Sequence, residues 1–359
     1  MRIAITGATG NVGSAVVRRL VDDHELVGLA RRIPPRTAAP GFATSLTWRP
    51  VDLTEDSCVQ GLVDAFTGAD AVVHLAWGFQ PSHRPDLLEA LGVGGTRRVL
   101  QAVERAGVPH LVHLSSLGAY APHPRDVPVA EDFPTSGVPT SPYSRHKVAA
   151  ERLLDAHEAR RGRGTNALVT RLRPGLVGQR AASSALLRYG VPGYVPARLL
   201  GHLPVLPLDR GLAISVVHAD DVADAVARVV EQQAVGAFNL ATDEPLTAAM
   251  IADAFGARLV HVPSAVLRGV VSASWHARLQ QLDPGWIDLA FALPLLDSSR
   301  ARRELGWHPT VGTSDVIAEV VAGMTDAESG PTPVLRRRSM PAVLGDALRS
   351  GPVSRRSRP

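Results

Sequence analysis

Short apolar runs and longer amphipathic stretches alternate along the first half of the chain. The apolar runs predict strands, and the stretches between them repeat their apolar positions every three to four residues, which predicts helices. This alternation is typical of a parallel sheet covered by helices. We therefore expect an α/β fold of the Rossmann type, with a doubly wound parallel sheet. The predicted strands are Arg2–Thr6, Leu26–Ala30, Leu46–Pro50, Ala71–Leu75, His110–Leu114 and Ala167–Arg171, and the predicted helices are Val12–Asp22, Cys58–Phe66, Asp86–Ala106 and Tyr143–Arg161.

The pattern loosens beyond Pro174 and indicates a second unit. Ile214–His218 and Ala237–Leu240 have the pattern of strands on either side of a helix, Val222–Gln232. The C-terminal end combines Gly, Pro, Ser and Arg with little apolar periodicity, which indicates disorder. The expected domains are a Rossmann domain over 1–179 with 212–243 returning to it, a smaller C-terminal substrate lobe over 180–211 and 244–326, and a disordered basic tail over 327–359.

The composition is that of a globular protein, with 45% hydrophobic and 20% charged residues. The formal net charge of +4 arises at the C-terminus, because residues 327–359 carry seven arginines against two acids. The rest of the chain is close to neutral, so a basic face that binds nucleic acid is not expected on the folded body.

The single cysteine, Cys58, excludes an intramolecular disulfide and indicates a reducing compartment. The apolar start of the chain ends at a glycine turn, which argues against a signal peptide. No uncharged apolar run approaches the ~18 residues that a membrane span needs. We expect a cytoplasmic protein without a membrane partner, and we expect no metal site because the 13 histidines show no ligand spacing.

A glycine-rich turn follows the first predicted strand directly. Its glycines have the spacing Gly-x-x-Gly-x-x-Gly and stand before the first predicted helix. Glycine lets the backbone approach a pyrophosphate, whose charge the helix N-terminus stabilises. A plain tight turn is the alternative, but the position directly after the strand favours dinucleotide binding. The residues expected to contact the cofactor here are Gly7, Thr9, Gly10, Asn11, Val12 and Gly13.

The end of the second predicted strand indicates which dinucleotide binds. An Asp or Glu there would accept hydrogen bonds from the adenosine ribose and repel a 2′-phosphate, whereas an arginine would bind that phosphate. The chain has Arg31 and Arg32 at this place. We therefore expect NADP(H) in preference to NAD(H), and the alternative is that both arginines are solvated surface residues.

Tyr143 and Lys147 stand one helical turn apart, so their side chains share one helix face. A free tyrosine has a pKa of about 10, and a neighbouring ammonium is expected to lower that pKa toward the working range of a base. Lys147 is the only lysine among 38 basic residues, and a bulkier arginine would be a poor substitute. Ser115 and Ser116 end the fifth predicted strand. This order predicts a catalytic trio of Ser116, Tyr143 and Lys147, although a chance match on a helix surface is the alternative.

The order of these motifs resembles the extended short-chain dehydrogenase/reductases, the NAD-dependent epimerase/dehydratase family, over residues 1 to about 320. Further segments carry the resemblance: Asp52-Leu53, His74-Leu75-Ala76-Trp77, Arg173-Pro174-Gly175, Val217 through Val222, and Leu305-Gly306-Trp307-His308-Pro309. The resemblance implies a Rossmann domain with a smaller substrate lobe and a catalytic role for the trio. It also implies cofactor contacts from Asp52, Leu53, Leu75, Ala76, Trp77, Ser115, Tyr143, Lys147 and Pro174.

Several positions depart from the pattern of that family. Gly92 stands where the family usually has Asn, which removes a polar contact near the cofactor. Trp77 replaces a small residue and is expected to narrow the nicotinamide side of the cleft. Leu117 and Gly118 stand where sugar-nucleotide dehydratases of the family have an Asp-Glu pair, so elimination of water is not expected.

The function that these features favour is NAD(P)-dependent hydride transfer to or from a small alcohol or carbonyl substrate, by an oxidoreductase or epimerase. Two alternatives stay open: a nucleotide-sugar epimerase with the same trio, and a redox sensor that binds NADP(H) without turnover. The expected partner is a small-molecule substrate, without nucleic acid, and a homodimer is left open. Residues that favour an apolar pocket are Tyr189, Tyr194, Trp275 and Trp286, with the core of the lobe as the alternative. Those that could hold a diphosphate are Arg180, Arg188, Arg198 and Arg210, although ordinary surface placement is favoured in a chain so rich in arginine.

Overall fold

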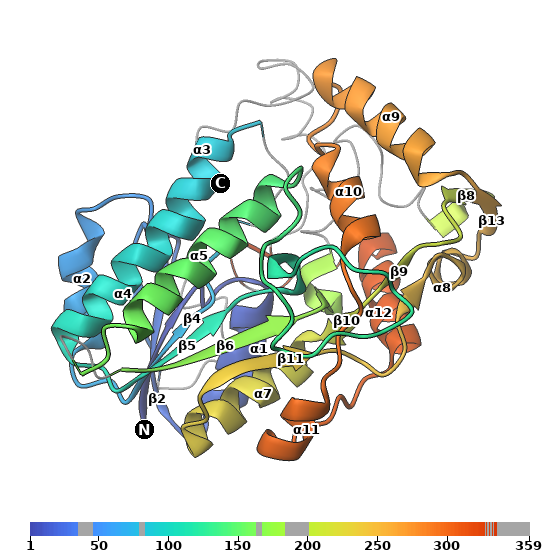
Figure 1. The fold of residues 1–359 in the computed structure, drawn as a ribbon. Helices are drawn as coiled ribbons and strands as arrows, with labels where there is room; N and C mark the ends of the chain where they lie inside the picture. The colour runs from blue at the N-terminus through green and yellow to red at the C-terminus, as the bar shows by residue number, and fades with distance from the viewer. Residues whose placement is uncertain are drawn as a thin grey trace.

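The computed structural model describes residues 1–34, 46–78, 83–162, 167–183 and 201–326, together with residues 328, 330, 332, 334 and 335. Within these ranges, seven parallel strands form a central sheet in the order β11-β6-β5-β4-β1-β2-β3 (Figure 1). The predicted fold class is confirmed. The strands are β1 (Arg2–Thr6), β2 (Glu25–Ala30), β3 (Leu46–Pro50), β4 (Ala71–His74), β5 (His110–Leu114), β6 (Leu168–Pro174) and β11 (Gly236–Leu240).

Helices cover both faces of this sheet. On one face lie α1 (Asn11–Leu20) and α7 (Ala219–Gln232), and on the other α2 (Cys58–Phe66), α4 (Gly95–Ala106) and α5 (Pro142–Glu158) (Figure 1). Central strands are apolar on both sides for this reason, and Ile3, Ala4 and Ile5 of β1 are all 0% exposed. The predicted helix over Asp86–Ala106 is interrupted: α3 (Pro85–Glu89) passes through a π-helical turn, Ala90–Gly94, into α4.

The strand order reverses between β4 and β1, and this reversal positions the site. Connections from the two strands leave in opposite directions, so a crevice opens at the carboxyl ends of the strands. The glycine turn follows β1, Trp77 follows β4, and Ser116 follows β5. All three segments therefore meet at the same edge of the sheet.

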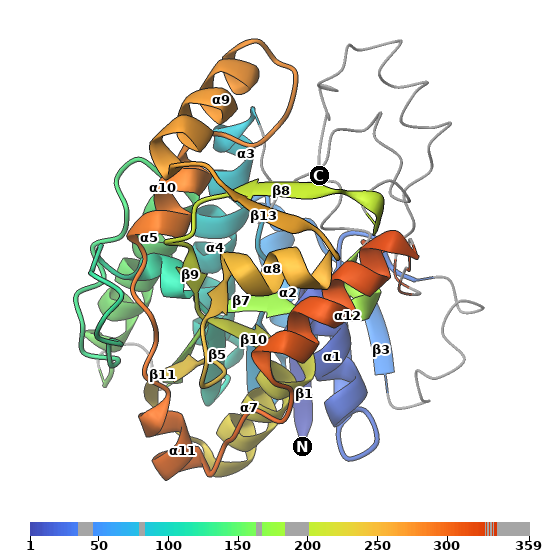
Figure 2. The same cartoon turned by 90° about the vertical axis from the view of Figure 1, so that its right-hand side faces the viewer.

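Three small two-stranded sheets and further helices form the remaining layer (Figure 2). The prediction of one strand over Ile214–His218 is corrected, because this segment divides into two short strands that pair outside the central sheet. The predicted strand Ala237–Leu240 lies within β11, which is the edge strand of the central sheet beside β6. The pairs are β7 (Leu176–Gly178) with β10 (Val216–His218), β8 (Val205–Leu208) with β13 (Arg258–His261), and β9 (Ala213–Ile214) with β12 (Leu246–Thr247). The helices are α8 (Ala248–Ala254), α9 (Ser264–His276), α10 (Gly285–Ala292), α11 (Ser299–Leu305) and α12 (Thr313–Thr325).

The expectation of a disordered tail from residue 327 falls mostly outside the described residues. Those that are described return to the glycine turn. The hydroxyl of Thr332 donates to the carbonyl oxygen of Thr9 at 2.7 Å, and Leu335 is 1% exposed. This short segment therefore packs against the first βα connection of the central sheet.

Candidate active site

One cavity of about 460 Å³ runs along the carboxyl ends of the strands, from the glycine turn to α10. All the residues predicted from the sequence for cofactor contact and catalysis line it. They are Gly7, Thr9, Gly10, Asn11, Val12, Gly13, Arg31, Arg32, Asp52, Leu53, Leu75, Ala76, Trp77, Ser115, Ser116, Tyr143, Lys147 and Pro174. Seven separate segments of the chain thus converge on a single space.

The glycine turn leaves room for a ligand to approach the backbone. Gly7 has a φ of +74°, and a Cβ at this residue would lie 2.7 Å from the amide nitrogen of Ala76. A Cβ at Gly13 would lie 2.1 Å from the carbonyl oxygen of Gly7, so no side chain fits there. No side chain caps α1 at Gly10, and its first turn contains no acid. The positive end of the helix is therefore open to an anion, which fits the pyrophosphate of a dinucleotide.

Tyr143 occupies the first turn of α5, directly across the cavity from the end of β5. The helix begins at Pro142 behind Ser141, whose Oγ accepts a hydrogen bond from the backbone N–H of Ser144. Ser116 lies near the Tyr143 phenol and acts to lower its pKa, and the Ser116 Oγ accepts a hydrogen bond from the backbone N–H of Gly118 at 3.0 Å. Both side chains line the cavity.

Gly118 has a steric role beside the tyrosine. A Cβ at this position would lie 2.8 Å from the Tyr143 ring. An acid such as the dehydratases of the family carry here would collide with the ring in this arrangement. The departure from the family pattern therefore has a packing reason as well as a chemical consequence.

The protonation of the tyrosine differs from the sequence-based expectation. Burial raises the pKa of Tyr143 to about 12, and the neighbouring Ser116 only partly opposes this effect. The expected lowering of the Tyr143 pKa is wrong, because the effect of burial is larger. Burial also lowers the pKa of Lys147 to about 7. At neutral pH the phenol therefore keeps its proton.

Lys147 is enclosed by a backbone carbonyl and an indole ring. Its Nζ donates to the carbonyl oxygen of Leu114 at 2.9 Å and lies 3.6 Å from the centroid of the Trp77 ring. The indole packs against Gly92, where a Cβ would lie 3.0 Å from the ring. The two departures from the family pattern, Trp77 and Gly92, are thus in contact, and the missing side chain makes room for the large one.

A buried polar network fixes α5 to the sheet. The Ser115 hydroxyl donates to Glu151 Oε1 at 2.5 Å, and the Arg173 guanidinium binds both oxygens of Glu151 at 2.9 and 3.0 Å. Burial alone would raise the pKa of Glu151, but the hydrogen bonds and charge of Arg173 hold it below its usual range. Arg173 also donates to the Tyr120 hydroxyl, which donates to Asn239 of β11. The network therefore connects the helix of Tyr143 and Lys147 to three strands.

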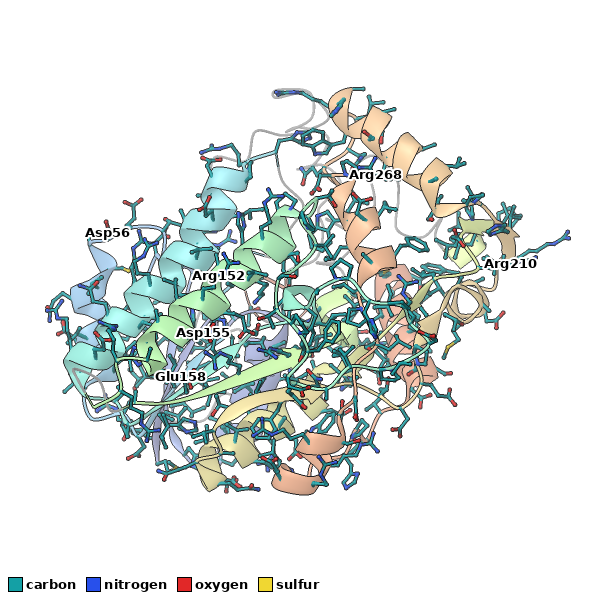
Figure 3. All side chains as sticks on the ribbon, viewed as in Figure 1. Asp56, Arg152, Asp155, Glu158, Arg210 and Arg268 are labelled. Atoms are coloured by element: carbon teal, nitrogen blue, oxygen red, sulfur yellow. The ribbon has the colours of Figure 1, made fainter. Side chains whose placement is uncertain are left out.

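A second arginine of β6 holds the outer side of the same helix. Arg171 pairs with Asp155 at 2.7 Å and with Glu158 at 2.6 Å, and Figure 3 labels both acids on α5. Arg171 itself is only 8% exposed at its side chain. These pairs limit rotation of α5 about its axis, which keeps Tyr143 and Lys147 aimed at the cavity.

The far end of the cavity is apolar, and the sequence indicated only part of it. Trp286 was expected in an apolar pocket, and its ring centroid lies 5.3 Å from that of Tyr143. Leu289 and Leu293 were missed, although their spacing from Trp286 at i+3 and i+7 is a signal that would have found them. Trp275 instead stacks on His83 at 4.6 Å and does not line this cavity.

The arginines considered for a diphosphate are placed differently from one another. Arg180 pairs with Asp326 at 2.6 Å and with Glu328, and it does not line the cavity. Arg210 follows β8 and does not line the cavity, and Figure 3 shows it at the edge of the molecule. The remaining residues predicted for the substrate lobe, Tyr189, Tyr194, Arg188 and Arg198, lie outside the described residues.

The described part of the chain contains neither a group of metal ligands nor a helix that could span a membrane. Its His, Cys, Asp and Glu side chains form no group of three or more that could hold a metal ion. None of its helices is both long enough and apolar enough to cross a membrane.

The fold and the cavity define a dinucleotide-binding α/β protein, with a glycine turn at the switch point of a doubly wound sheet. Comparison with known families agrees with this class. Residues 3–241 match the NAD dependent epimerase/dehydratase family, and the chain belongs to this family.

Relatives of this chain differ in length, and two of them are UDP-glucose 4-epimerases. UDP-glucose 4-epimerase of Mycolicibacterium smegmatis is 29% identical over 333 residues, which cover 89% of this chain and 97% of that protein. An uncharacterized protein of Mycobacterium tuberculosis is 27% identical over 325 residues, and the match spans 89% of this chain but only 29% of the length of that relative. UDP-glucose 4-epimerase of Thermus thermophilus in complex with NAD has a similar structure, with a TM-score of 0.66, 24% identity and coverage of 91% and 100% of the two chains.

Proposed function

We propose that the protein transfers hydride between a nicotinamide dinucleotide and a small alcohol or carbonyl substrate, with Ser116, Tyr143 and Lys147 as its catalytic residues. The observation that carries this proposal is that Ser116, Tyr143 and Lys147 line the same cavity as the open end of α1. A dehydrogenase among the relatives supports it: L-arabinose 1-dehydrogenase (NAD(P)(+)) of Haloferax volcanii is 31% identical over 171 residues, 45% of this chain and 63% of that protein.

The residues that would hold the dinucleotide follow the cavity. The glycine turn and the N-terminus of α1 would bind the pyrophosphate, Asp52 and Leu53 the adenosine, and Lys147 with Tyr143 the nicotinamide ribose. When bound, the dinucleotide supplies or accepts the hydride.

Tyr143 and Ser116 handle the proton at the substrate oxygen. In the reductive direction, Tyr143 Oη donates its proton to the carbonyl oxygen while the carbon is reduced. The raised pKa suits this step, because the phenol is protonated at neutral pH. Ser116 Oγ already accepts from Gly118, so its own proton is directed toward the Tyr143 or substrate oxygen. Oxidation of the alcohol is the reverse of this step.

Replacing the tyrosine tests the proposal. We expect Tyr143→Phe to lower turnover of NADPH with carbonyl substrates by about 100-fold or more, since the proton donor is removed. Its affinity for NADP⁺, measured by calorimetry, should stay within a few fold of wild type. Thr67→Val is the control, because it removes a hydroxyl that lies at the end of α2 and outside the cavity. Wild-type turnover by Tyr143→Phe, with NADP⁺ still bound, would overturn the assignment.

NADP is the dinucleotide that we propose for this chain, although NAD is the cofactor named for the Thermus thermophilus neighbour. Arg31 and Arg32 line the cavity directly after β2, where a 2′-phosphate would be bound. We expect the double substitution Arg31→Ala and Arg32→Ala to weaken NADP⁺ binding at least tenfold and NAD⁺ binding less than threefold. Arg49→Ala, an exposed arginine of β3 outside the cavity, is the control. An equal loss for both dinucleotides would contradict the preference.

A further inference from the structure

The face of α10 that borders the cavity is built from apolar side chains. Trp286, Leu289, Ala290 and Leu293 are spaced i, i+3, i+4 and i+7, so they share one face, and all of them line the cavity. Asp288 of the same helix belongs to a different face, where its carboxylate pairs with Arg268 of α9 at 2.6 Å (Figure 3). The helix therefore presents an apolar face to this cavity, whereas Asp288 borders a second cavity that Tyr143 and Trp286 also line.

The walls around the tyrosine continue this apolar surface. Leu117 and Ile214 line the cavity from the end of β5 and from β9. The Tyr143 ring stands between two indoles: its centroid lies 5.3 Å from that of Trp286 at an interplanar angle of 31°, and 6.4 Å from that of Trp77 at 82°. All three aromatic residues line the cavity, so an apolar ring held there would contact them.

Charged side chains among the described cavity residues lie elsewhere. Arg31, Arg32 and Asp52 line the end of the cavity proposed for the adenosine. The Lys147 ammonium donates a hydrogen bond to the Leu114 carbonyl oxygen and lies against the Trp77 ring. Among the side chains of the α10 face only the indole of Trp286 carries a polar hydrogen, so most hydroxyl groups of a sugar enclosed by this face would find no side-chain partner on it, and each unpaired group would cost about 1–3 kcal/mol. An apolar ring loses nothing by the same enclosure and gains from burial.

We infer that the substrate is an apolar secondary alcohol or ketone, whose hydrocarbon ring packs against Trp286, Leu289 and Leu293. This inference rests on the proposed hydride transfer, since it names the substrate class of the same site. In the oxidation, the hydrogen of the carbinol carbon leaves with its electron pair and is transferred to the oxidised dinucleotide. The hydroxyl proton is transferred to the Tyr143 phenolate, and the product is the ketone. Reduction returns both and consumes the reduced dinucleotide.

The test uses the full chain with NADP⁺ and two kinds of probe. The bicyclic ketone 2-decalone represents the apolar class, and UDP-glucose and L-arabinose represent the polar classes. We expect calorimetry to give a dissociation constant for 2-decalone at least tenfold below that of either polar probe. Trp286→Ala should weaken 2-decalone at least tenfold while NADP⁺ affinity changes less than threefold. Trp286→Phe, which keeps an aromatic ring, should recover most of the affinity and guards against a folding defect. Trp48→Ala, which changes a tryptophan outside both cavities, is the matched control.

Each outcome separates this inference from the proposed function. Tighter binding of UDP-glucose or L-arabinose, absence of 2-decalone binding, or 2-decalone binding that Trp286→Ala leaves unchanged would overturn the apolar substrate class. Oxidation of a polar probe with formation of NADPH would also overturn the apolar substrate class, but it would support the proposed hydride transfer. Conversely, Trp286-dependent binding of 2-decalone without any exchange of hydride with the dinucleotide would support the apolar pocket and contradict the proposed function.

Discussion

Lys147 is the residue whose environment matters most to the chemistry of the cavity. It is 2% exposed, and its ammonium is enclosed by the Leu114 carbonyl and the Trp77 ring. Burial lowers its pKa to about 7, and the nearby Glu151 carboxylate opposes this effect only in part. The charge of this side chain is therefore sensitive to pH in the range where enzymes work.

The buried lysine predicts a rise of stability with pH. Its pKa is near 7 in the folded protein and 10.5 ordinarily, so the unfolded chain binds more protons between these values. The free energy of unfolding should therefore increase from about pH 7 to 9, by up to about 1.4 kcal/mol per pH unit. Urea unfolding of wild type and Lys147→Met at several pH values measures this, and the substitution should flatten the slope.

Other buried groups act outside that range of pH. Burial and the charge of Lys147 lower the pKa of His74 to about 3, so this histidine affects stability below its ordinary value of 6.5. Partial burial raises the pKa of the Cys58 thiol from 9.0. This group therefore lowers the free energy of unfolding as the pH rises above about 9. A slope that persists unchanged in Lys147→Met would show that Lys147 is not its source.

Individual site residues could be predicted from the sequence because each follows a local signal. The i, i+4 spacing of Tyr143 and Lys147 and the serines after an apolar run are visible without tertiary structure. Their pKa values could not be predicted, because burial of Tyr143 and Lys147 depends on Trp77 and α10, which the chain brings in from other segments. The expectation of a lowered phenol pKa failed for that reason.

The segment that follows β4 and the segment that leads into α4 pack closely against each other. Trp77 follows β4, and Gly92 lies in the π-helical turn that leads into α4. The indole takes the space that a side chain at Gly92 would need. A π turn inside a helix is rare and frequently marks a functional site, and here it borders the Lys147 contact.

This fit predicts a coupled effect of two substitutions. Gly92→Asn restores the residue usual in the family but forces its Cβ to 3.0 Å from the indole, so it should lower the free energy of unfolding by about 1–3 kcal/mol. In a Trp77→Ala background the same change should cost less than about 1 kcal/mol. Denaturant unfolding of the four proteins gives the coupling.

A glycine without neighbours provides the control for that cycle. A Cβ at Gly61 of α2 would meet nothing within 4 Å, so Gly61→Asn should change stability by less than about 0.5 kcal/mol. Equal costs of Gly92→Asn in both backgrounds would mean that the indole and the glycine are independent.

Elements of the central sheet were predictable, whereas their interruptions were not. Apolar runs located all six predicted strands of the first half, since strands buried on both faces carry a strong signal. The break of Asp86–Ala106 into α3, a π turn and α4 has no local sign as clear as a proline, because it reflects packing against Trp77. The division of Ile214–His218 likewise arises from pairing with β7 and β12, which lie far apart in the sequence.

At the scale of the whole molecule, the cavity is shared by both parts of the chain. The sheet contributes the glycine turn, the serines and α5, and α10 closes the end opposite to the glycine turn with its apolar face. The network from Glu151 through Arg173 and Tyr120 reaches Asn239, whose side-chain amide donates to the carbonyl oxygens of Val129 and Asp297. The placement of α10 could not be predicted, since more than a hundred residues separate it from Tyr143.

Transfer of a labelled hydride tests the central claim most directly. The full chain is incubated with NADPH that carries deuterium at the transferring carbon of the nicotinamide, together with 2-decalone, UDP-linked keto sugars and aldoses, and the products are examined by mass spectrometry. The account predicts an alcohol that contains one deuterium from the dinucleotide, formed by wild type and lost in Tyr143→Phe. An alcohol without deuterium, or no labelled alcohol from any substrate class while NADPH is bound, would contradict it.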